Sequence, residues 1–191
     1  RGCLGAIETL CSDAKYPVIA KETGSGISAK VAGMLYGAGV QAIDIGGWGG
    51  TSWPLIEGIR AGESNRPDDL ALSAASRIFR EWGIPTVVSL CDVARRGGPV
   101  IATGGVRTGI DIAKGIALGA DLCGMALPLL APALEGEEAL AGTIATINRQ
   151  LVMAMFLCGS RGIAEQKETK LFITGVTRQM VDEIMEEYNG Y

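Results

Sequence analysis

Short apolar runs recur along this chain, and most of them end in polar residues or glycine. Runs of this kind are typical of buried parallel strands, and four of them predict strands: 17–21, 41–45, 99–103 and 122–126. Apolar residues at helical spacing follow the runs, as Ile112, Ala113 and Ile116 do after the third. The pattern predicts an α/β fold in which about four parallel strands are covered by helices on their outer face.

The helical segments have recognisable ends. Ser28 is placed to cap one helix, Thr51 or Ser52 to cap another, and Pro54 suits the first turn of the latter. Polar residues at 63–69 predict a loop, and 159–174 predict a mixed linker. The periodic segments predict helices at 4–10, from Ser28 to Gly37, from Pro54 to the polar loop, at 70–82 and 109–118, from Leu127, and at 137–158 and 177–188.

The segment from Thr86 to Cys91 (TVVSLC) supports two interpretations. Its β-branched residues favour a strand by propensity. Only a few residues separate it from the strand at Val100, however, and a crossover between parallel strands needs about a dozen or more. The connection argument outweighs propensity, so we predict a helix over Pro85–Arg95 with the proline in its first turn.

Composition limits the function classes. A net charge of −4 without a basic cluster argues against general binding of nucleic acid, which needs grouped Lys and Arg side chains. Five cysteines without a CxxC pair are expected to be reduced thiols of a cytoplasmic protein. No apolar run approaches the roughly 20 residues of a membrane span, and no secretory signal is visible. Neither a nucleic acid nor a membrane is therefore expected as a partner.

The stretch PVIATGGVRTGIDIAKGIALGADLCGMALPLL (99–130) carries the strongest chemical signal. It predicts a strand, a glycine turn, a helix, a second strand and another helical start, so two helix N-termini follow adjacent strand ends. Gly104 and Gly105 let a phosphate approach the backbone, and Arg107 adds a positive charge. Eight-stranded α/β barrels often build a phosphate site after strands 7 and 8. The stretch predicts such a phosphate site. The alternative is a tight turn between strand and helix that lies beside a surface arginine and binds nothing, because it would show the same sequence pattern.

Part of this stretch, ATGGVRTGIDIAKGIALGAD, resembles a segment shared by FMN-dependent barrel enzymes, which include hydroxy-acid oxidases, glutamate synthases and type 2 isopentenyl-diphosphate isomerases. Purine-nucleotide reductases and dehydrogenases of the inosinate family carry a similar segment. Two further stretches, VIAKETGSGIS (18–28) and AIDIGGWGGTSW (42–53), are similar to those of the type 2 isomerases. Hydroxy-acid oxidases place a histidine base before their second glycine segment, and this chain contains no histidine.

The resemblance extends from about Tyr16 to the C-terminus and implies the C-terminal half of a TIM (β/α)8 barrel, with residues 1–191 as a single region. An open half-barrel would leave two largely apolar edge strands exposed. The chain begins at Arg1 without a methionine, so we expect a piece or a processed product of a longer protein. Its expected partners are the missing N-terminal half-barrel and, in a homo-oligomer, further copies.

Carried over residue by residue, the resemblance also implies a flavin site. Lys21 would stabilise negative charge on a reduced flavin, although a solvated lysine at a strand end is the ordinary alternative. Trp53 would form an aromatic wall for substrate or flavin, with core packing as its alternative. Glu22 and Asp44 stay open as acid/base groups, Asp44 equally as a backbone partner. The implied FMN-binding residues are Lys21, Gly46, Thr51, Gly104, Gly105, Val106, Arg107, Ala126 and Leu127.

The activity implied by the resemblance is the isomerisation of isopentenyl diphosphate to dimethylallyl diphosphate in isoprenoid biosynthesis. It would use reduced FMN, Mg²⁺ on the diphosphate and NADPH as reductant. The family's catalytic and metal-binding residues would lie upstream of residue 1, so neither is expected within this chain. Two alternatives stay open: another FMN-dependent barrel oxidoreductase, and a non-catalytic half-barrel that binds phosphate.

Overall fold

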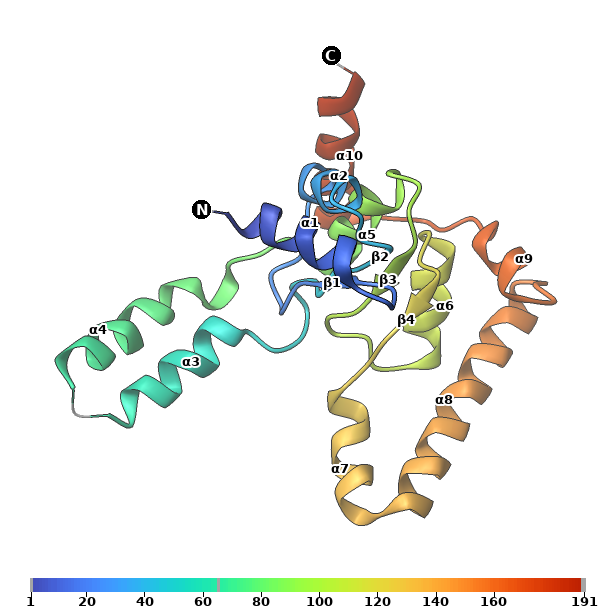
Figure 1. The fold of residues 1–191 in the computed structure, drawn as a ribbon. Coiled ribbons are helices and arrows are strands. Elements are labelled where there is room, and N and C mark those ends of the chain that lie inside the picture. Colours follow the sequence, from blue (N-terminus) through green and yellow to red (C-terminus); the bar gives the residue numbers. More distant parts are fainter. Residues whose placement is uncertain (1, 65, 190–191) are drawn as a thin grey trace.

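A small parallel sheet lies at the centre of the chain, whose computed structural model describes residues 2–64 and 66–189 (Figure 1). The strands of this sheet are β1 (Ile19–Lys21), β2 (Ala42–Asp44), β3 (Val100–Ala102) and β4 (Leu122–Cys123). They pair in the order β1-β2-β3-β4, and every pair is parallel. The predicted sheet is therefore confirmed, although each strand is shorter than its apolar run.

Helices precede, connect and follow the strands. Within the described part they are α1 (Cys3–Asp13), α2 (Ala29–Gly37), α3 (Trp53–Gly62), α4 (Pro67–Ser76), the 3₁₀ turn η1 (Ile78–Glu81), α5 (Thr86–Ala94), α6 (Gly109–Ala117), α7 (Leu127–Glu135), α8 (Glu137–Leu157), α9 (Ile163–Lys167) and α10 (Gly175–Asn189). The segment with two interpretations lies in α5, so the helical prediction is confirmed.

Two segments between the predicted helices differ from expectation. The loop predicted at 63–69 is wrong over residues 67–69, which form the first turn of α4. Pro67 suits that turn, and Asp68 and Asp69 complement the positive end of the helix, so residues that indicated a polar loop instead begin a helix. The linker predicted at 159–174 contains α9, which is too short to show helical periodicity.

Strands β2 and β3 pack with α5 at the centre of the hydrophobic core. Ile43, Ile45 and Val100 are fully buried, and Leu90 and Val93 of α5 belong to the same cluster. Complete burial of an aliphatic side chain of this size contributes about 1.5–3 kcal/mol. The two central strands and α5 therefore hold the sheet together and fix the level at which the strands end.

Helix α5 also fastens the loop between β1 and α2. The buried Ser89 hydroxyl donates to the Ile27 carbonyl at 2.7 Å and accepts a hydrogen bond from the Ile27 N–H at 3.0 Å. The Asp92 carboxylate accepts from the N–H of Ala29 at 2.7 Å, at the start of α2. Ser28 caps the same helix, as predicted, by accepting from a second backbone N–H. Residues 27–29 are thereby fixed to the core.

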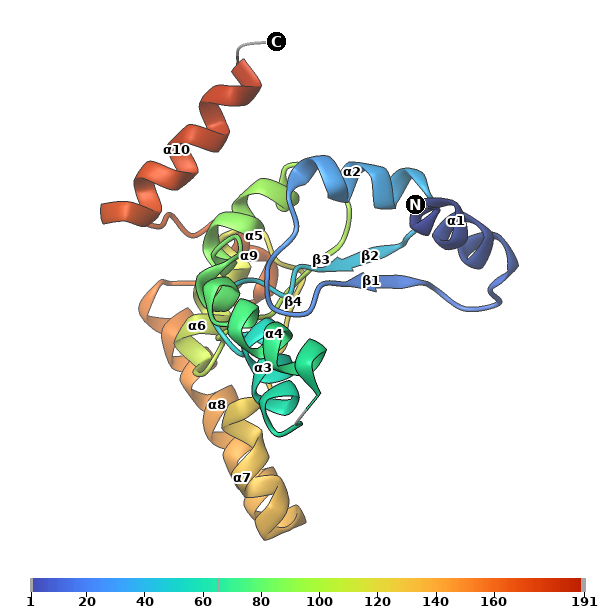
Figure 2. The same ribbon diagram turned by 90° about the vertical axis from the view of Figure 1, so that its left-hand side faces the viewer.

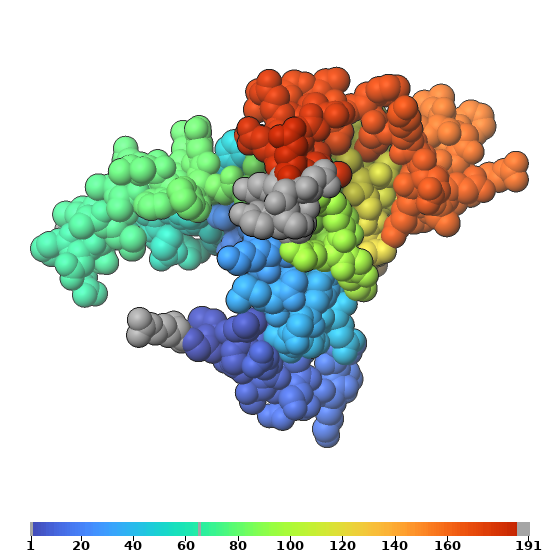
Figure 3. Space-filling view, turned by 90° about the horizontal axis from the view of Figure 1, so that it is seen from above, coloured from blue at the N-terminus to red at the C-terminus, as the bar shows by residue number. Residues whose placement is uncertain are grey.

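Three helical parts project from the sheet (Figures 1 and 2). They are the α3–α4 hairpin, the α7–α8 hairpin and the C-terminal helix α10, and Figure 3 shows the first of these extending away from the body of the molecule. A Cβ on Gly58 of α3 would lie 1.6 Å from the Ser76 hydroxyl of α4. Small residues therefore form the contact between these two helices, and larger apolar side chains such as Ile59 and Leu70 stay exposed.

Helix α8 has the length and composition of a membrane-spanning helix. It contains 21 residues, with a mean hydropathy of 1.3 over its most apolar stretch, of which 6% is buried. The expectation that no segment approaches this length is therefore wrong for α8. The helix nevertheless packs along α6 and α7, and the Gln150 side chain accepts a hydrogen bond from the N–H of Gly109 at 2.9 Å. Length and composition alone do not separate a membrane span from a helix that packs on protein.

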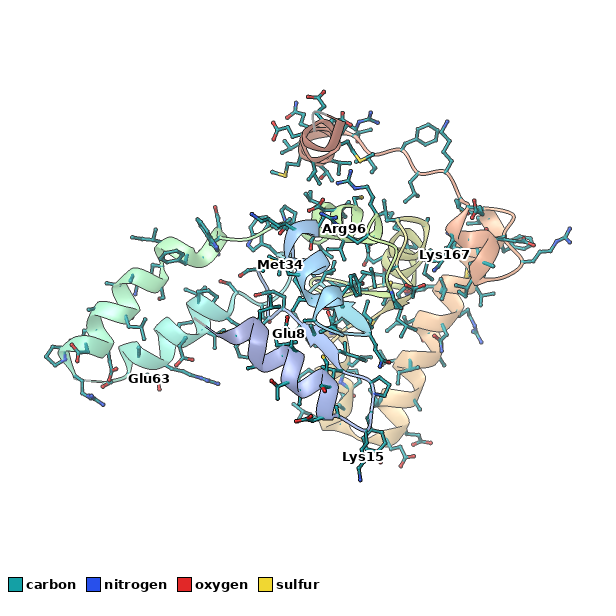
Figure 4. The ribbon with its side chains drawn as sticks, turned by 45° about the horizontal axis from the view of Figure 1, so that its top comes forward. Glu8, Lys15, Met34, Glu63, Arg96 and Lys167 are labelled. Carbon is teal, nitrogen blue, oxygen red and sulfur yellow. The ribbon has the colours of Figure 1, made fainter. Side chains whose placement is uncertain are left out.

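An ion pair at the amino-terminal end of the sheet makes the free energy of unfolding depend on pH in the acid range. Asp121 lies 2.5 Å from the ammonium of Lys167 (labelled in Figure 4) and accepts from the N–H of Val100 at 2.8 Å. Burial acts to raise the pKa of the Asp121 carboxyl, but the Lys167 and Val100 hydrogen bonds outweigh it and the net pKa is lowered.

Because the folded pKa of Asp121 lies below the unfolded one, the carboxylate stabilises the fold above about pH 4, and this stability is lost as the pH falls further. We expect Asp121→Asn to remove the contribution of this carboxylate to the pH dependence of stability, and Lys167→Met to reduce that contribution. Urea unfolding at a series of pH values between about 2 and 6 measures the free energy of unfolding of each variant. An unchanged pH profile in both variants would contradict the assignment.

Candidate functional site

The carboxyl ends of three neighbouring strands bring Lys21, Asp44 and Thr103 together. The Lys21 ammonium lies 2.7 Å from Asp44 Oδ2 and donates to Thr103 Oγ1 at 3.1 Å. The Thr103 hydroxyl donates to the other carboxylate oxygen of Asp44, which also accepts from the N–H of Gly46 at 3.1 Å. The Asp44 side chain is 12% exposed and the Lys21 side chain 54%. A buried carboxylate thus holds an accessible cation at the open end of the sheet.

Glu22, which follows Lys21, shapes the next loop. One of its carboxylate oxygens accepts hydrogen bonds from the N–H groups of Gly24 at 2.6 Å, of Ser25, and of Gly26 at 3.2 Å. A carboxylate that accepts three backbone hydrogen bonds serves to fold the chain, so its geometry favours a structural role over acid/base chemistry.

The glycine-rich loop after β2 lies directly against the glycine turn after β3. A Cβ on Gly104 would lie 2.0 Å from the carbonyl oxygen of Gly47, and a Cβ on Gly105 would lie 2.2 Å from that of Gly49. Gly104 and Gly105 also have φ angles of 102° and 80°, which L side chains rarely adopt. The glycines of both segments are therefore required because one backbone packs on the other.

The turn after β3 leaves backbone donors available. Among the described residues, none accepts a hydrogen bond from the N–H groups of residues 104–106. A Cβ on Gly50 would lie 3.0 Å from the nitrogen of Gly105, so the absence of a side chain at position 50 keeps that N–H uncovered. Successive free N–H groups on a glycine turn form a suitable site for an anion. The residues present therefore fit a phosphate group.

The first turn of α6 is less available than the sequence indicates. Thr108 and Asp111 form a capping box, in which the Asp111 carboxylate accepts from the N–H of Thr108 at 3.0 Å. The N–H of Arg107 donates to the same carboxylate at 3.1 Å. Because Asp111 supplies the negative charge at this helix end, an anion would bind the turn at 104–106 rather than the helix terminus itself.

The segment after β4 begins the next helix. Helix α7 begins there with Ala126 as its N-cap, which provides no side-chain hydrogen bond, and Leu127 is exposed. Arg107 and Pro128 line one groove of about 570 Å³ between α7 and α8. The two predicted phosphate-binding segments therefore follow the carboxyl ends of neighbouring parallel strands, β3 and β4.

The remaining predicted residues lie toward β1. Gly46 has a φ of 45°, and a Cβ there would lie 2.1 Å from the Glu22 carbonyl oxygen. Thr51 and Trp53 border Gly24, whose Cβ would lie 2.5 Å from the Thr51 carbonyl oxygen and 3.4 Å from Trp53 Cδ1. Trp53 is 48% exposed, so it does not pack in the core of the described residues. The predicted site residues thus form two groups, one beside β1 and one after β3 and β4.

Sequence reasoning missed part of this site. Asp44 was an open candidate, and its alternative role as a partner of a backbone N–H is seen at Gly46. Thr103 was missed, although its place as the last residue of an apolar run carried a weak signal of a polar strand end. Thr86 carried none, because its segment was interpreted only for its secondary structure, as a strand or as a helix. Its hydroxyl nevertheless donates to the carbonyl of Gly104 at 2.6 Å.

The sequence profile of a family described as FMN-dependent dehydrogenase matches residues 3–172. The chain belongs to this family. Free N–H groups beside Gly50 are consistent with the phosphate of the cofactor in the family's description. Among the described residues, no three His, Cys, Asp or Glu side chains are grouped so that they could hold a metal ion.

Two curated relatives show which enzymes of the family this chain resembles. An isopentenyl-diphosphate delta-isomerase of Methanoregula boonei is 58% identical over 182 residues, which cover 95% of this chain and 50% of the relative. The same enzyme of Methanosarcina acetivorans is 47% identical over 182 residues, with 95% and 49% covered. The chain therefore spans about half the length of the curated relatives it matches.

Solved structures show the fold. A protein of Pediococcus acidilactici named as a lactate oxidase aligns with a TM-score of 0.64 at 21% identity, covering 90% of this chain and 41% of that chain. The four parallel strands and their helices correspond to part of the fold of that protein. The predicted fold class, half of a (β/α)8 barrel, is confirmed.

Proposed function

We propose that this chain is the FMN-phosphate-binding half of an isopentenyl-diphosphate isomerase, which acts in isoprenoid biosynthesis. The observation that carries the proposal is the set of uncovered N–H groups at 104–106 beside Gly50, at the strand ends where Lys21 is held. The names of the 58% and 47% identical relatives support the choice of isopentenyl and dimethylallyl diphosphate as substrate and product.

Each predicted site residue has a role in this proposal. FMN, when bound and reduced, supplies the flavin chemistry of the isomerisation. The turn of Gly104, Gly105 and Val106 would hold its phosphate through backbone N–H groups, with Arg107, Ala126 and Leu127 at the rim. Lys21, oriented by Asp44 and Thr103, would place a cation near the flavin ring. Gly46 and Thr51 would contact the cofactor, and the exposed Trp53 would border it.

Other parts of the proposal rest on the protein beyond these residues. Mg²⁺ would be bound by residues of the other half of the barrel, as the resemblance to the isomerases implies. NADPH as the source of electrons, assembly into a homo-oligomer and a cytoplasmic location belong to the proposal as well. The other half of the barrel would supply the proton-handling residues.

The proposal is tested by reconstitution. Residues 1–191 are mixed with the half of the Methanoregula boonei isomerase that they do not match, and FMN, a reductant and Mg²⁺ are added. We expect the two halves together to bind FMN and to convert isopentenyl diphosphate into dimethylallyl diphosphate, whereas neither half does so alone. A matched control uses the same mixture with Gly105→Val in the 191-residue half.

A second candidate, an FMN-dependent oxidoreductase, is favoured by the family's description as dehydrogenases. The same two halves separate the candidates when isomerisation is assayed with reduced FMN, and substrate oxidation is assayed with oxidised FMN and an electron acceptor in place of the reductant. FMN binding with substrate oxidation and without isomerisation would support the oxidoreductase, and absence of FMN binding would refute both.

A further inference from the structure

Thr86, the first residue of α5, touches both glycine segments of the site. Its hydroxyl donates to the Gly104 carbonyl at 2.6 Å, and its N–H donates to the carbonyl of Trp48 at 3.2 Å. A Cβ on Gly47 would lie 2.4 Å from Thr86 Cα, and one on Gly49 would lie 3.0 Å from Thr86 Oγ1. The glycines at 47 and 49 therefore make room for this threonine and its hydrogen bond.

The Thr86 hydroxyl is not used to cap its own helix. Pro85 is the N-cap of α5, and no side-chain hydrogen bond closes that helix end. Capping by a side chain comes from the N-cap residue, and Thr86 is the residue after it, so its hydroxyl is free for another partner. Here the hydroxyl instead reaches a carbonyl 18 residues further along the chain. That long-range contact indicates a role in the turn after β3.

The carbonyl of Gly104 and the N–H of Gly105 belong to one peptide unit. No cis peptide occurs among the described residues, so this unit is trans and the two groups point in opposite directions. A hydroxyl that holds the carbonyl toward α5 therefore holds the Gly105 N–H away from α5. This N–H is the donor that Gly50 leaves uncovered.

A peptide between two glycines rotates easily, because both flanking residues tolerate either sign of φ. Without a fixed partner for the carbonyl, the Gly104–Gly105 unit can turn over and withdraw its N–H. Hydrogen bonding at the carbonyl also polarises the peptide and strengthens the N–H as a donor. Both effects favour an anion only when the hydroxyl is present.

We propose that Thr86 is a positioning residue that fixes the Gly104–Gly105 peptide and aims the Gly105 N–H at the phosphate of FMN. The inference rests on the proposed function and adds a residue from outside the phosphate-binding segment to the site. Thr86 does not touch the phosphate in this proposal; it acts through the peptide.

The test compares FMN with riboflavin, which lacks the phosphate, in the reconstituted two-half protein. We expect Thr86→Val, which keeps the shape and removes the hydroxyl, to weaken FMN binding about tenfold, since one hydrogen bond orients the donor. Riboflavin binding should stay unchanged, and Thr86→Ser should restore FMN binding to within about twofold of the wild type. Thr9→Val is the matched control, because the Thr9 hydroxyl also donates to a backbone carbonyl, at 3.0 Å, but within α1.

Three results would overturn the inference: equal FMN affinity in Thr86→Val and wild type, parallel loss of both flavins in Thr86→Val, or no recovery in Thr86→Ser. A second measurement stays valid if the wild type binds no FMN and the proposed function fails. The Gly105 amide resonance is followed by NMR while inorganic phosphate is added. We expect a saturable shift in the wild type and Thr86→Ser and its loss in Thr86→Val; equal shifts in all three would contradict a positioning role.

Discussion

Valine at position 105 is expected to reduce FMN affinity more than about a hundredfold in the reconstituted protein. The added Cβ would lie 2.2 Å from the carbonyl oxygen of Gly49, and the φ of 80° is strained for any β-branched residue. The turn must move to relieve both, and its N–H groups move with it. Titration of flavin fluorescence measures the loss.

Gly97→Val is a control that separates the effect of backbone strain on FMN affinity from the effect of the steric clash. Gly97 has a φ of 78°, close to that of Gly105, but nothing lies within 4 Å of the position of its Cβ. The control therefore introduces the same backbone strain without the collision. We expect it to lower stability and to retain FMN binding. Similar FMN affinity in Gly105→Val and wild type would show that the phosphate of FMN does not bind at this turn.

Residues 1–191 alone are expected neither to form a stable monomer nor to isomerise isopentenyl diphosphate. Both edges of the sheet are open: Ile19 on β1 is 52% exposed and Leu122 on β4 is 63% exposed. Unpaired edge strands with apolar side chains associate with other chains. The chain also spans only about half of its relatives' length, 50% of the first.

Sedimentation of the purified chain over a range of concentrations measures the first part, and an isomerase assay with FMN, reductant and Mg²⁺ measures the second. We expect concentration-dependent association, which the complementary half should suppress by pairing with β1 and β4. Leu122→Lys is a suitable variant and should weaken the association of the isolated chain, since a charge on an edge strand discourages strand pairing. A concentration-independent monomer with full turnover would contradict the prediction.

Much of the fold was predictable because local patterns and connection lengths agreed. The apolar runs located all four strands, and the short distance from Thr86 to Val100 identified α5 as a helix against its β propensity. The predicted helix boundaries were wrong where the same residue types favour both a loop and a helix start. Pro67 with Asp68 and Asp69 suits either a loop or a helix start, and packing against α3 selects the helix.

The candidate site was predictable only where a segment has its own signature. The glycine turn and Arg107 could be found within one stretch. The partners of that turn could not, because they come from segments that meet only in the folded chain. Gly49, Gly50 and Thr86 reach Gly104 and Gly105 through tertiary packing. Most glycines of the loop after β2 likewise allow one backbone to pack on another, which the sequence does not indicate.

The attachment of the β1–α2 loop to α5 has a consequence for folding. Ser89 and Asp92 hold Ile27 and Ala29 by three hydrogen bonds from a helix more than 60 residues away, and Ser89 is fully buried. Loops usually open locally and exchange their amide hydrogens early. This one must break three hydrogen bonds to a core helix before it opens, so we expect the amides of Ile27 and Ala29 to exchange late, together with those of α5.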